Sequence, residues 1–184
     1  LLRFPLRSPT LPPATHTNAY VVGDKELLVI DPGTPDEAEL TRLLTLLTGL
    51  RERGRRTSGI LLTHHHRDHA SGVPFLGKAL RVPVLAHPAT AQRVAAQLGV
   101  TVDRTIAEGE LIPLGRARLR ALHTPGHAPG HLCFYDEAGG ELIATSTALG
   151  DGGVFSVDLR DERYLPFEYA GAVSRWRLEL PHAV

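Results

Sequence analysis

Four histidines and a carboxylate are concentrated in the short segment from residue 63 to residue 69. The segment reads Thr-His-His-His-Arg-Asp-His and follows the apolar run from Gly59 to Leu62, which is typical of a short buried strand. Neutral histidine nitrogen is the commonest metal ligand in proteins, and carboxylate oxygen suits zinc, iron or manganese. The segment therefore predicts a metal-binding loop at the end of a strand.

The spacing within the loop divides its side chains into two groups. His64 and His66 are two residues apart, so in extended backbone they point to the same side and can meet one ion, while His65 points away. Asp68 and His69 follow where the chain turns, so they can face a second ion, roughly 3.5–4 Å from the first as in two-metal hydrolytic sites. The alternative is a metal-free histidine-rich loop or an affinity tag, which the internal position and the interruption by two charged residues disfavour.

A second histidine motif, Thr124-Pro-Gly-His-Ala-Pro-Gly-His131, lies further along the chain. Together with His64-x-His66-x-Asp68-His69, it resembles the two metal motifs of the metallo-β-lactamase superfamily, in the same order. The resemblance extends from about Asn18 to the end of the chain and is closest to the branch that contains glyoxalase II and other small β-lactamase-like hydrolases. It implies a mixed α/β (α+β) fold, the four-layer αββα sandwich, with the site along one edge of two packed sheets.

The resemblance also implies which residues hold the metals. His64, His66 and His127 would bind the first metal and leave the open tetrahedral position that a catalytic zinc needs. Asp68 and His69 would belong to the second metal, and Asp68 would also orient the attacking water or carry its proton. One or two zinc ions are expected, with iron or manganese as alternatives.

Two positions depart from the family pattern and weaken the second metal position. The family places a bridging aspartate after the second motif, where this chain has Ser146, whose neutral hydroxyl is a weak ligand. Asp151, five residues later, is the reserve candidate. The family also supplies a C-terminal histidine, for which His182 is a poor match because it lacks flanking glycines. These gaps leave the three-histidine site intact and allow occupancy by one metal.

Other residues near the motifs are interpreted as supporting rather than ligating. Asp31 stands where the family has an aspartate that supports the metal loop, although an ordinary turn aspartate is an equally good interpretation of the sequence. His123 and His131 are expected to support the second motif, with His131 facing away into hydrogen bonds. His87 is assigned a structural role. Cys133, the single cysteine, is predicted to be a buried and inert thiol in a strand.

Periodicity and turn residues predict the elements that position these loops. Leucines at helical spacing predict a helix from Pro35 to about Arg53, and another helix is expected over 88–98, ended by Gly99. The remaining predicted elements are an extended N-terminal stretch without much regular structure over 1–17, a β-hairpin over 18–23 and 26–31, strands over 59–63, 82–86, 110–114, 118–123, 132–135 and 141–145, a short helix over 71–80 that starts at a polar cap, and a closing helix over 166–178.

Composition limits the organisation and the partners of the chain. Its 184 residues, 42% of them hydrophobic, fit one core, so residues 1–184 are expected to form a single metallo-β-lactamase-like domain. The absence of methionine, even at position 1, and the short C-terminus indicate that natural residues are missing at both ends. The zero formal net charge disfavours bulk attraction to nucleic acids or membranes. With no apolar span and no export signal, a cytoplasmic location is expected.

The predicted function is that of a metal-dependent hydrolase that uses metal-activated water on a small-molecule substrate, and the resemblance implies a thioester or a related acyl compound. One alternative is a phosphodiesterase or ribonuclease of the same fold, supported only by the basic stretch from Arg51 to Arg56. A single-iron sulfur dioxygenase is another, which Ser146 disfavours. The last is a metal-binding member with impaired catalysis, because Ser146 replaces the bridging aspartate. The sequence predicts no oligomeric state.

Overall fold

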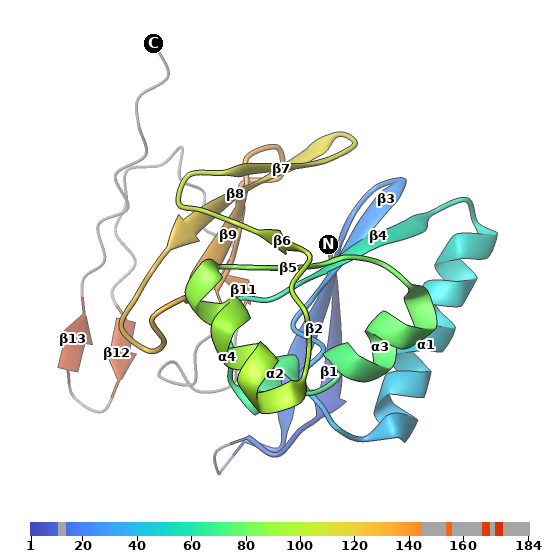
Figure 1. Ribbon diagram of the computed structural model, residues 1–184. Helices are drawn as coiled ribbons and strands as arrows, with labels where there is room; N and C mark the ends of the chain where they lie inside the picture. Colours follow the sequence, from blue (N-terminus) through green and yellow to red (C-terminus); the bar gives the residue numbers. More distant parts are fainter. Residues whose placement is uncertain (11–13, 145–153, 156–166, 170–171, 175–184) are drawn as a thin grey trace.

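Two β-sheets packed face to face form the centre of the protein, and helices cover the outer face of the first sheet (Figure 1). The computed structural model describes residues 1–10, 14–144, 154–155, 167–169 and 172–174. Among these residues, no helix is long and apolar enough to cross a membrane. The arrangement is the mixed α+β architecture that the sequence predicted.

The first sheet combines antiparallel and parallel strands. In spatial order its strands are β1 (Leu2–Arg7), β2 (His16–Gly23), β3 (Glu26–Ile30), β4 (Arg56–Leu61), β5 (Val84–Ala86) and β6 (Arg104–Thr105). Strands β1 to β3 pair antiparallel, whereas β3 to β6 pair parallel. Parallel strands need crossover connections, and these contain the helices α1 (Glu37–Glu52), α2 (Arg67–Ala70), α3 (Val73–Leu80) and α4 (Pro88–Leu98).

The second sheet is antiparallel throughout. Its spatial order is β11 (Val154–Phe155), β10 (Glu141–Ile143), β9 (Leu132–Asp136), β8 (Ala117–His123) and β7 (Leu111–Leu114). Two short strands, β12 (Phe167–Tyr169) and β13 (Ala172–Ser174), pair separately. Several sequence predictions are confirmed. They are the hairpin formed by β2 and β3, the helices α1 and α4, and the pairing of β9 with β10.

Alternate residues along the strands of the first sheet face two different hydrophobic clusters. Ala19 and Val21 of β2 pack toward the helices, with the buried leucines of α1. Tyr20 and Val22 point the other way, toward the second sheet and residues such as Phe134. This period of two is what a strand with both faces buried requires. Each sheet is therefore held by packing on its neighbours rather than by pairing alone.

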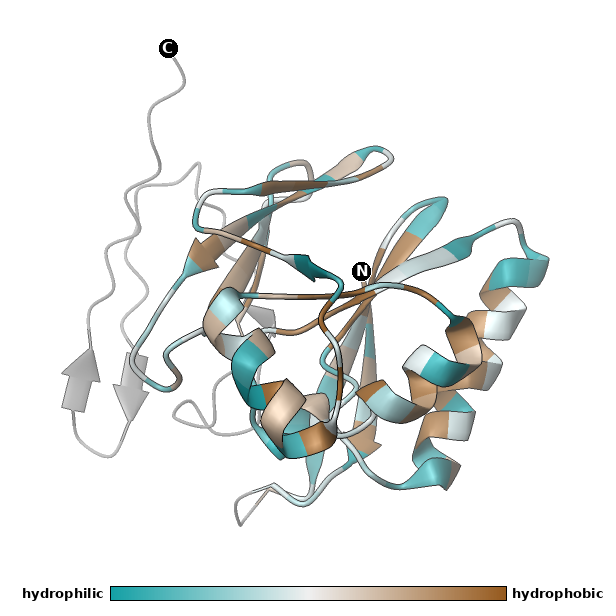
Figure 2. Cartoon of the chain, in the orientation of Figure 1, coloured by the Kyte–Doolittle hydropathy of each residue, from teal (hydrophilic) through white to brown (hydrophobic). Residues whose placement is uncertain are grey.

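Helix α1 shows why the sequence predicted it well. Its N-cap, Asp36, accepts hydrogen bonds from the backbone N–H groups of residues 38 and 39, which satisfies donors that the helix itself cannot pair. Its buried residues recur at helical spacing: Leu40, Leu43, Leu47 and Leu50. Hydrophobic and hydrophilic residues accordingly share its surface (Figure 2).

Three sequence predictions about the elements were wrong in whole or in part. The N-terminal stretch is not irregular, because β1 pairs with β2 from Leu2 to Arg7. The helix expected over 71–80 is confirmed as α3 (Val73–Leu80), but the polar cap is wrong, because its N-cap is Gly72 and the separate short helix α2 precedes it. The described part of 166–178 contains strands β12 and β13 instead of a helix. The aromatic residues there and Val173 favour a strand, and Gly171 disfavours a helix. Strand β6 was not predicted, because its two residues are exposed and carry no hydrophobic pattern.

The turn that follows β3 lies directly against the helix that follows the first histidine motif. A Cβ atom on Gly33 would stand 1.7 Å from the carbonyl oxygen of Asp68, so only glycine allows this approach. The backbone N–H of Gly72 donates to the carbonyl of Pro32 at 2.8 Å. The turn therefore fixes the place of α2 and the residues that α2 carries.

We expect Gly33→Ala to lower the free energy of unfolding by about 1–3 kcal/mol or more, because the added methyl group must push α2 away from the turn. Gly49→Ala is the matched control, since a Cβ atom at Gly49 in α1 meets nothing within 4 Å. That variant should gain about 0.5–1 kcal/mol, because alanine is favoured over glycine inside a helix. Urea unfolding of the three proteins measures both values, and equal changes in the two variants would refute the packing argument.

Candidate metal centre

Three imidazole rings from two separate loops converge at the edge where the sheets meet. His64 and His66 come from the loop after β4, and His127 comes from the loop after β8. Nε2 of His64 lies 3.1 Å from Nδ1 of His66 and 3.1 Å from Nε2 of His127. Two nitrogens that bind the same tetrahedral zinc are about 3.3 Å apart. The cluster therefore has the donor type and the dimensions of a three-histidine zinc site.

The three rings are kept neutral by their surroundings. Burial, followed by the nearby His69 and other rings, holds the pKa of His64 far below its usual range. Burial also lowers the pKa of His66, against the opposing charge of Asp68. Burial and the neighbouring rings lower the pKa of His127 to about 4. At neutral pH the three rings thus offer nitrogen lone pairs, as metal ligands must.

The carboxylate of Asp31 controls the orientation of the first loop. It is fully buried and accepts hydrogen bonds from the backbone N–H and the hydroxyl of Thr63, at 2.8 and 2.5 Å. The same hydroxyl lies 2.9 Å from Nδ1 of His64. Because the hydroxyl proton is directed at Asp31, Nδ1 of His64 must be the donor in that contact. This leaves the lone pair of His64 on Nε2, the atom that faces the cluster.

Asp31 also holds His69. Its Oδ2 atom lies 3.0 Å from Nδ1 of His69, and Nε2 of His69 lies 3.8 Å from Oδ2 of Asp68. Burial alone would lower the pKa of His69, but the hydrogen bond and the charge of Asp31, with the charge of Asp68, raise it instead. Asp68 and His69 therefore lie side by side next to His64, whose ring centroid is 4.2 Å from that of His69.

A second group of potential ligand atoms comprises Asp31, His64 and His69, all buried. The two oxygens of Asp31 are already engaged by the Thr63 and His69 donors. This is the geometry of a residue that supports ligands rather than binds the ion. The arrangement favours the supporting role for Asp31 over the ordinary turn aspartate.

The loop that carries His127 rests on the N-terminal end of α4. His87 caps α4 through Nδ1 and stacks on His123, with ring centroids 4.3 Å apart. The hydroxyl of Thr90 donates to the carbonyl of Gly130 at 2.9 Å. These contacts give His87 the predicted structural role and place His123 outside the cluster. The part played by Thr90 was missed, because nothing in the sequence links it to a loop forty residues away.

The remaining residues of the two motifs have other surroundings. Nδ1 of His131 lies 2.7 Å from the hydroxyl of Thr124, which is the hydrogen-bonded, supporting position predicted for it. Burial raises the pKa of the Cys133 thiol, as expected for an inert buried cysteine. Nδ1 of His65 is buried and has no hydrogen-bond partner among the described residues. Ser146, Asp151 and His182, the predicted candidates for completing the second metal position, lie outside the described residues.

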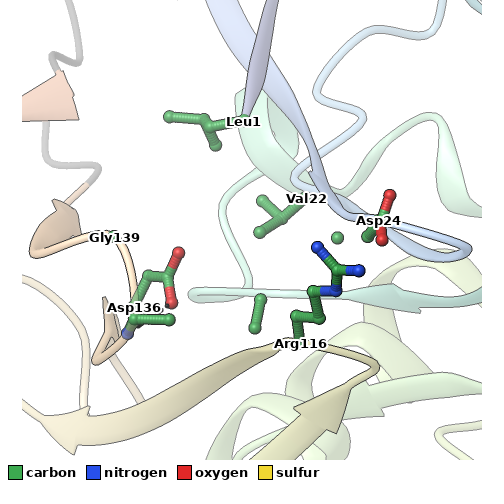
Figure 3. Close-up of a pocket in the computed structure, with 9 residues that line it drawn as sticks. Leu1, Val22, Asp24, Arg116, Asp136 and Gly139 are labelled. Atoms are coloured by element: carbon green, nitrogen blue, oxygen red, sulfur yellow. Dashed lines mark hydrogen bonds between the residues drawn. The ribbon is translucent and has the colours of Figure 1, made fainter.

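A cleft among the described residues lies away from this cluster. It has a volume of about 410 Å³ and is lined by Leu1 and by residues of the turns before β3, before β8 and between β9 and β10, with Arg116 pointing toward Asp24 (Figure 3). Asp24 and Arg116 lie before β3 and β8, whereas Asp31 and His123 lie at the other ends of these two strands. The lining includes no histidine, cysteine or hydroxyl side chain. The cleft therefore offers neither a metal site nor a nucleophile.

Comparison with known proteins assigns the chain to a protein family. The sequence pattern of the Metallo-beta-lactamase superfamily matches residues 12–179, which include both histidine loops. The chain belongs to the metallo-beta-lactamase superfamily. Membership in this superfamily implies a divalent metal, and the three-histidine cluster provides suitable donors for it.

Relatives within the superfamily include thioester hydrolases. Hydroxyacylglutathione hydrolase of Cereibacter sphaeroides is 34% identical over 131 residues, 71% of this chain and 48% of that protein. Atrochrysone carboxyl ACP thioesterase of Aspergillus terreus is 32% identical over 137 residues, 74% of this chain and 40% of that protein. The chain therefore spans less than half the length of these relatives.

Solved structures show the same fold. A metallo-beta-lactamase family protein from Thermus thermophilus is 26% identical, with a TM-score of 0.60, and the match covers 81% of this chain and 60% of that one. A metallo-beta-lactamase from Cronobacter sakazakii, 24% identical, has a TM-score of 0.64 over 82% of this chain and 63% of that one. The second likeness, at this identity, concerns the fold alone.

We expect Asp31→Asn to weaken zinc binding about 10–100-fold, the usual cost of removing a partner that orients metal ligands. Asp31 has a φ of 49°, and asparagine tolerates that backbone conformation, so the change removes the charge while keeping the turn. Asp24→Asn, in the exposed turn before β3, is the matched control. Competition with a chromophoric chelator measures the affinity. Equal zinc affinities for the two variants would show that Asp31 does not organise the ligands.

Proposed function

We propose that the protein is a metal-dependent hydrolase that cleaves thioesters. The observation that carries this proposal is the convergence of His64, His66 and His127 with neutral, inward-facing nitrogens. Two relatives named as thioester-cleaving enzymes support the substrate class. We further propose zinc as the metal, because three imidazoles at these distances suit a tetrahedral zinc site with one open position.

Each residue near the cluster has a defined task in this proposal. His64, His66 and His127 would hold the ion. When bound there, zinc would act as a Lewis acid and lower the pKa of a water ligand to about 7. Asp68 lies beside the cluster and next to His69, and 8% of its surface is exposed. Its carboxylate would orient the attacking water and accept its proton. His69 with Asp68 would serve a second metal.

The substrate is proposed to be a small-molecule acyl thioester. A thioester has an electrophilic carbonyl, on which negative charge develops during attack, and a cluster that holds a divalent ion stabilises that charge. We also propose a cytoplasmic location, supported by the single buried cysteine, because disulfide-free chains are typical of reducing compartments. The prediction of impaired catalysis depends on Ser146 and stays a prediction.

Two of the four arginines in the basic stretch that motivates the nucleic-acid alternative contact the hairpin of β2 and β3. The guanidinium of Arg55 donates to the backbone carbonyls of Gly23 and Asp24. Arg56 forms an ion pair with Glu26 at 2.7 Å. Arg55 and Arg56 therefore tie the start of β4 to this hairpin, whereas Arg51 and Arg53 are exposed. The nucleic-acid alternative stays a prediction that rests on these two exposed arginines. The sulfur dioxygenase alternative gains no observation of its own.

The test is hydrolysis of a panel of glutathione, pantetheine and coenzyme A thioesters by the zinc-loaded protein. We expect turnover that a chelator abolishes and zinc restores. His127→Ala should lower kcat/KM more than about a hundredfold, because losing one of three ligands costs at least as much as losing a supporting partner. His16→Ala is the control, since His16 is exposed and contacts Thr15. A zinc-loaded protein that cleaves none of these thioesters would refute the proposal.

A further inference from the structure

The N-terminal segment of the chain reaches the metal loop after it leaves β1. Ser8 is buried, and its hydroxyl donates to the carbonyl of Gly33 at 2.5 Å. The backbone N–H of Ser8 donates to the carbonyl of Thr15 at 3.1 Å, and that of Thr10 donates to the carbonyl of Ser8 at 2.8 Å. Residues 8–10 are thereby tied to the turn that packs against α2.

Thr10 makes a direct contact with a residue of the first histidine motif. Its hydroxyl donates to Oδ2 of Asp68 at 2.9 Å, across 58 positions of sequence. The same oxygen lies 3.8 Å from Nε2 of His69. A hydrogen bond to an ionised carboxylate is about twice as strong as one between neutral groups, so Thr10 can hold the carboxylate against rotation.

Asp68 and His69 are thus each held by a residue from another segment of the chain. His69 is fixed through Nδ1 by Asp31, on the turn after β3. Asp68 is fixed by Thr10, from the segment after β1. Asp68 lies on a helix of only four residues, which by itself does little to set the direction of a side chain. The two supports together keep Oδ2 of Asp68 and Nε2 of His69 side by side, 3.8 Å apart.

We propose that Thr10 is a positioning residue, which holds the Asp68 carboxylate beside His69 so that the two can bind a second metal ion. The proposal rests on the metal binding that the proposed function requires. It makes the N-terminal segment part of the metal centre. Thr10 acts through Asp68 and does not itself touch the ion.

The experiment compares zinc binding by the unaltered protein, Thr10→Val, Thr10→Ser and Thr45→Val, each titrated against a chelator of known affinity. Valine has the shape of threonine without its hydroxyl, whereas serine keeps the hydroxyl. Thr45 is an exposed residue of α1 whose hydroxyl donates a hydrogen bond to the backbone carbonyl of Thr41. Its variant therefore controls for the loss of a threonine hydroxyl away from the metal centre. Thr10→Val should weaken the second zinc equivalent about 10–100-fold and leave the first unchanged, while the other two variants bind both equivalents normally.

The outcomes separate this proposal from the proposed function. Equal binding of the second equivalent by Thr10→Val and the unaltered protein would overturn the role of Thr10, as would uptake of one equivalent by the unaltered protein. If that one-zinc protein still cleaves thioesters, the proposed function stands without the role of Thr10. Selective weakening of the second equivalent in a protein that cleaves no thioester would support Thr10 and refute the proposed function.

Discussion

The buried carboxylate of Asp31 is the interaction on which the metal centre depends. A charge without solvent is costly unless it is fully hydrogen-bonded, and here Thr63 and His69 supply the donors. Because the Thr63 hydroxyl in turn accepts a hydrogen bond from the Nδ1–H group of His64, one carboxylate orients two histidines. Its positive φ of 49° is a backbone strain that these hydrogen bonds stabilise.

The fold explains why residues from distant loops meet at this carboxylate. Strands β3 and β4 are parallel, so the segments after them, with Asp31 and Thr63, emerge at the same edge of the sheet. The backbone N–H of Leu132, at the start of β9, donates to the carbonyl of Thr63 at 2.9 Å. That bond joins the second sheet to the first loop and brings His127 within reach of His64. The packing of the two sheets thus sets the relative positions of the two histidine loops.

The sequence predicted those features that depend on local pattern. The leucine repeat of α1, the Gly99 end of α4 and the order of the two histidine motifs are all contained in short windows, so they were predictable. Thr10 and Thr90 were not, because a lone threonine carries no signal for a partner 58 or 40 positions away. Pairing of β1 with β2 was also missed, because Pro5 within β1 and Pro9 after it obscure the strand pattern. The helix predicted over 166–178 rested on length and pattern and overlooked residue propensities that favour strands, which pair in the described residues.

The central claim is that His64, His66 and His127 form one zinc site. The most direct test is a crystal structure of the zinc-loaded protein with anomalous data collected on both sides of the zinc absorption edge. The account predicts an anomalous peak bonded to Nε2 of His64, Nδ1 of His66 and Nε2 of His127, each at about 2.0–2.1 Å. Zinc-saturated crystals with no peak among these three nitrogens, or with zinc bound only elsewhere, would contradict it.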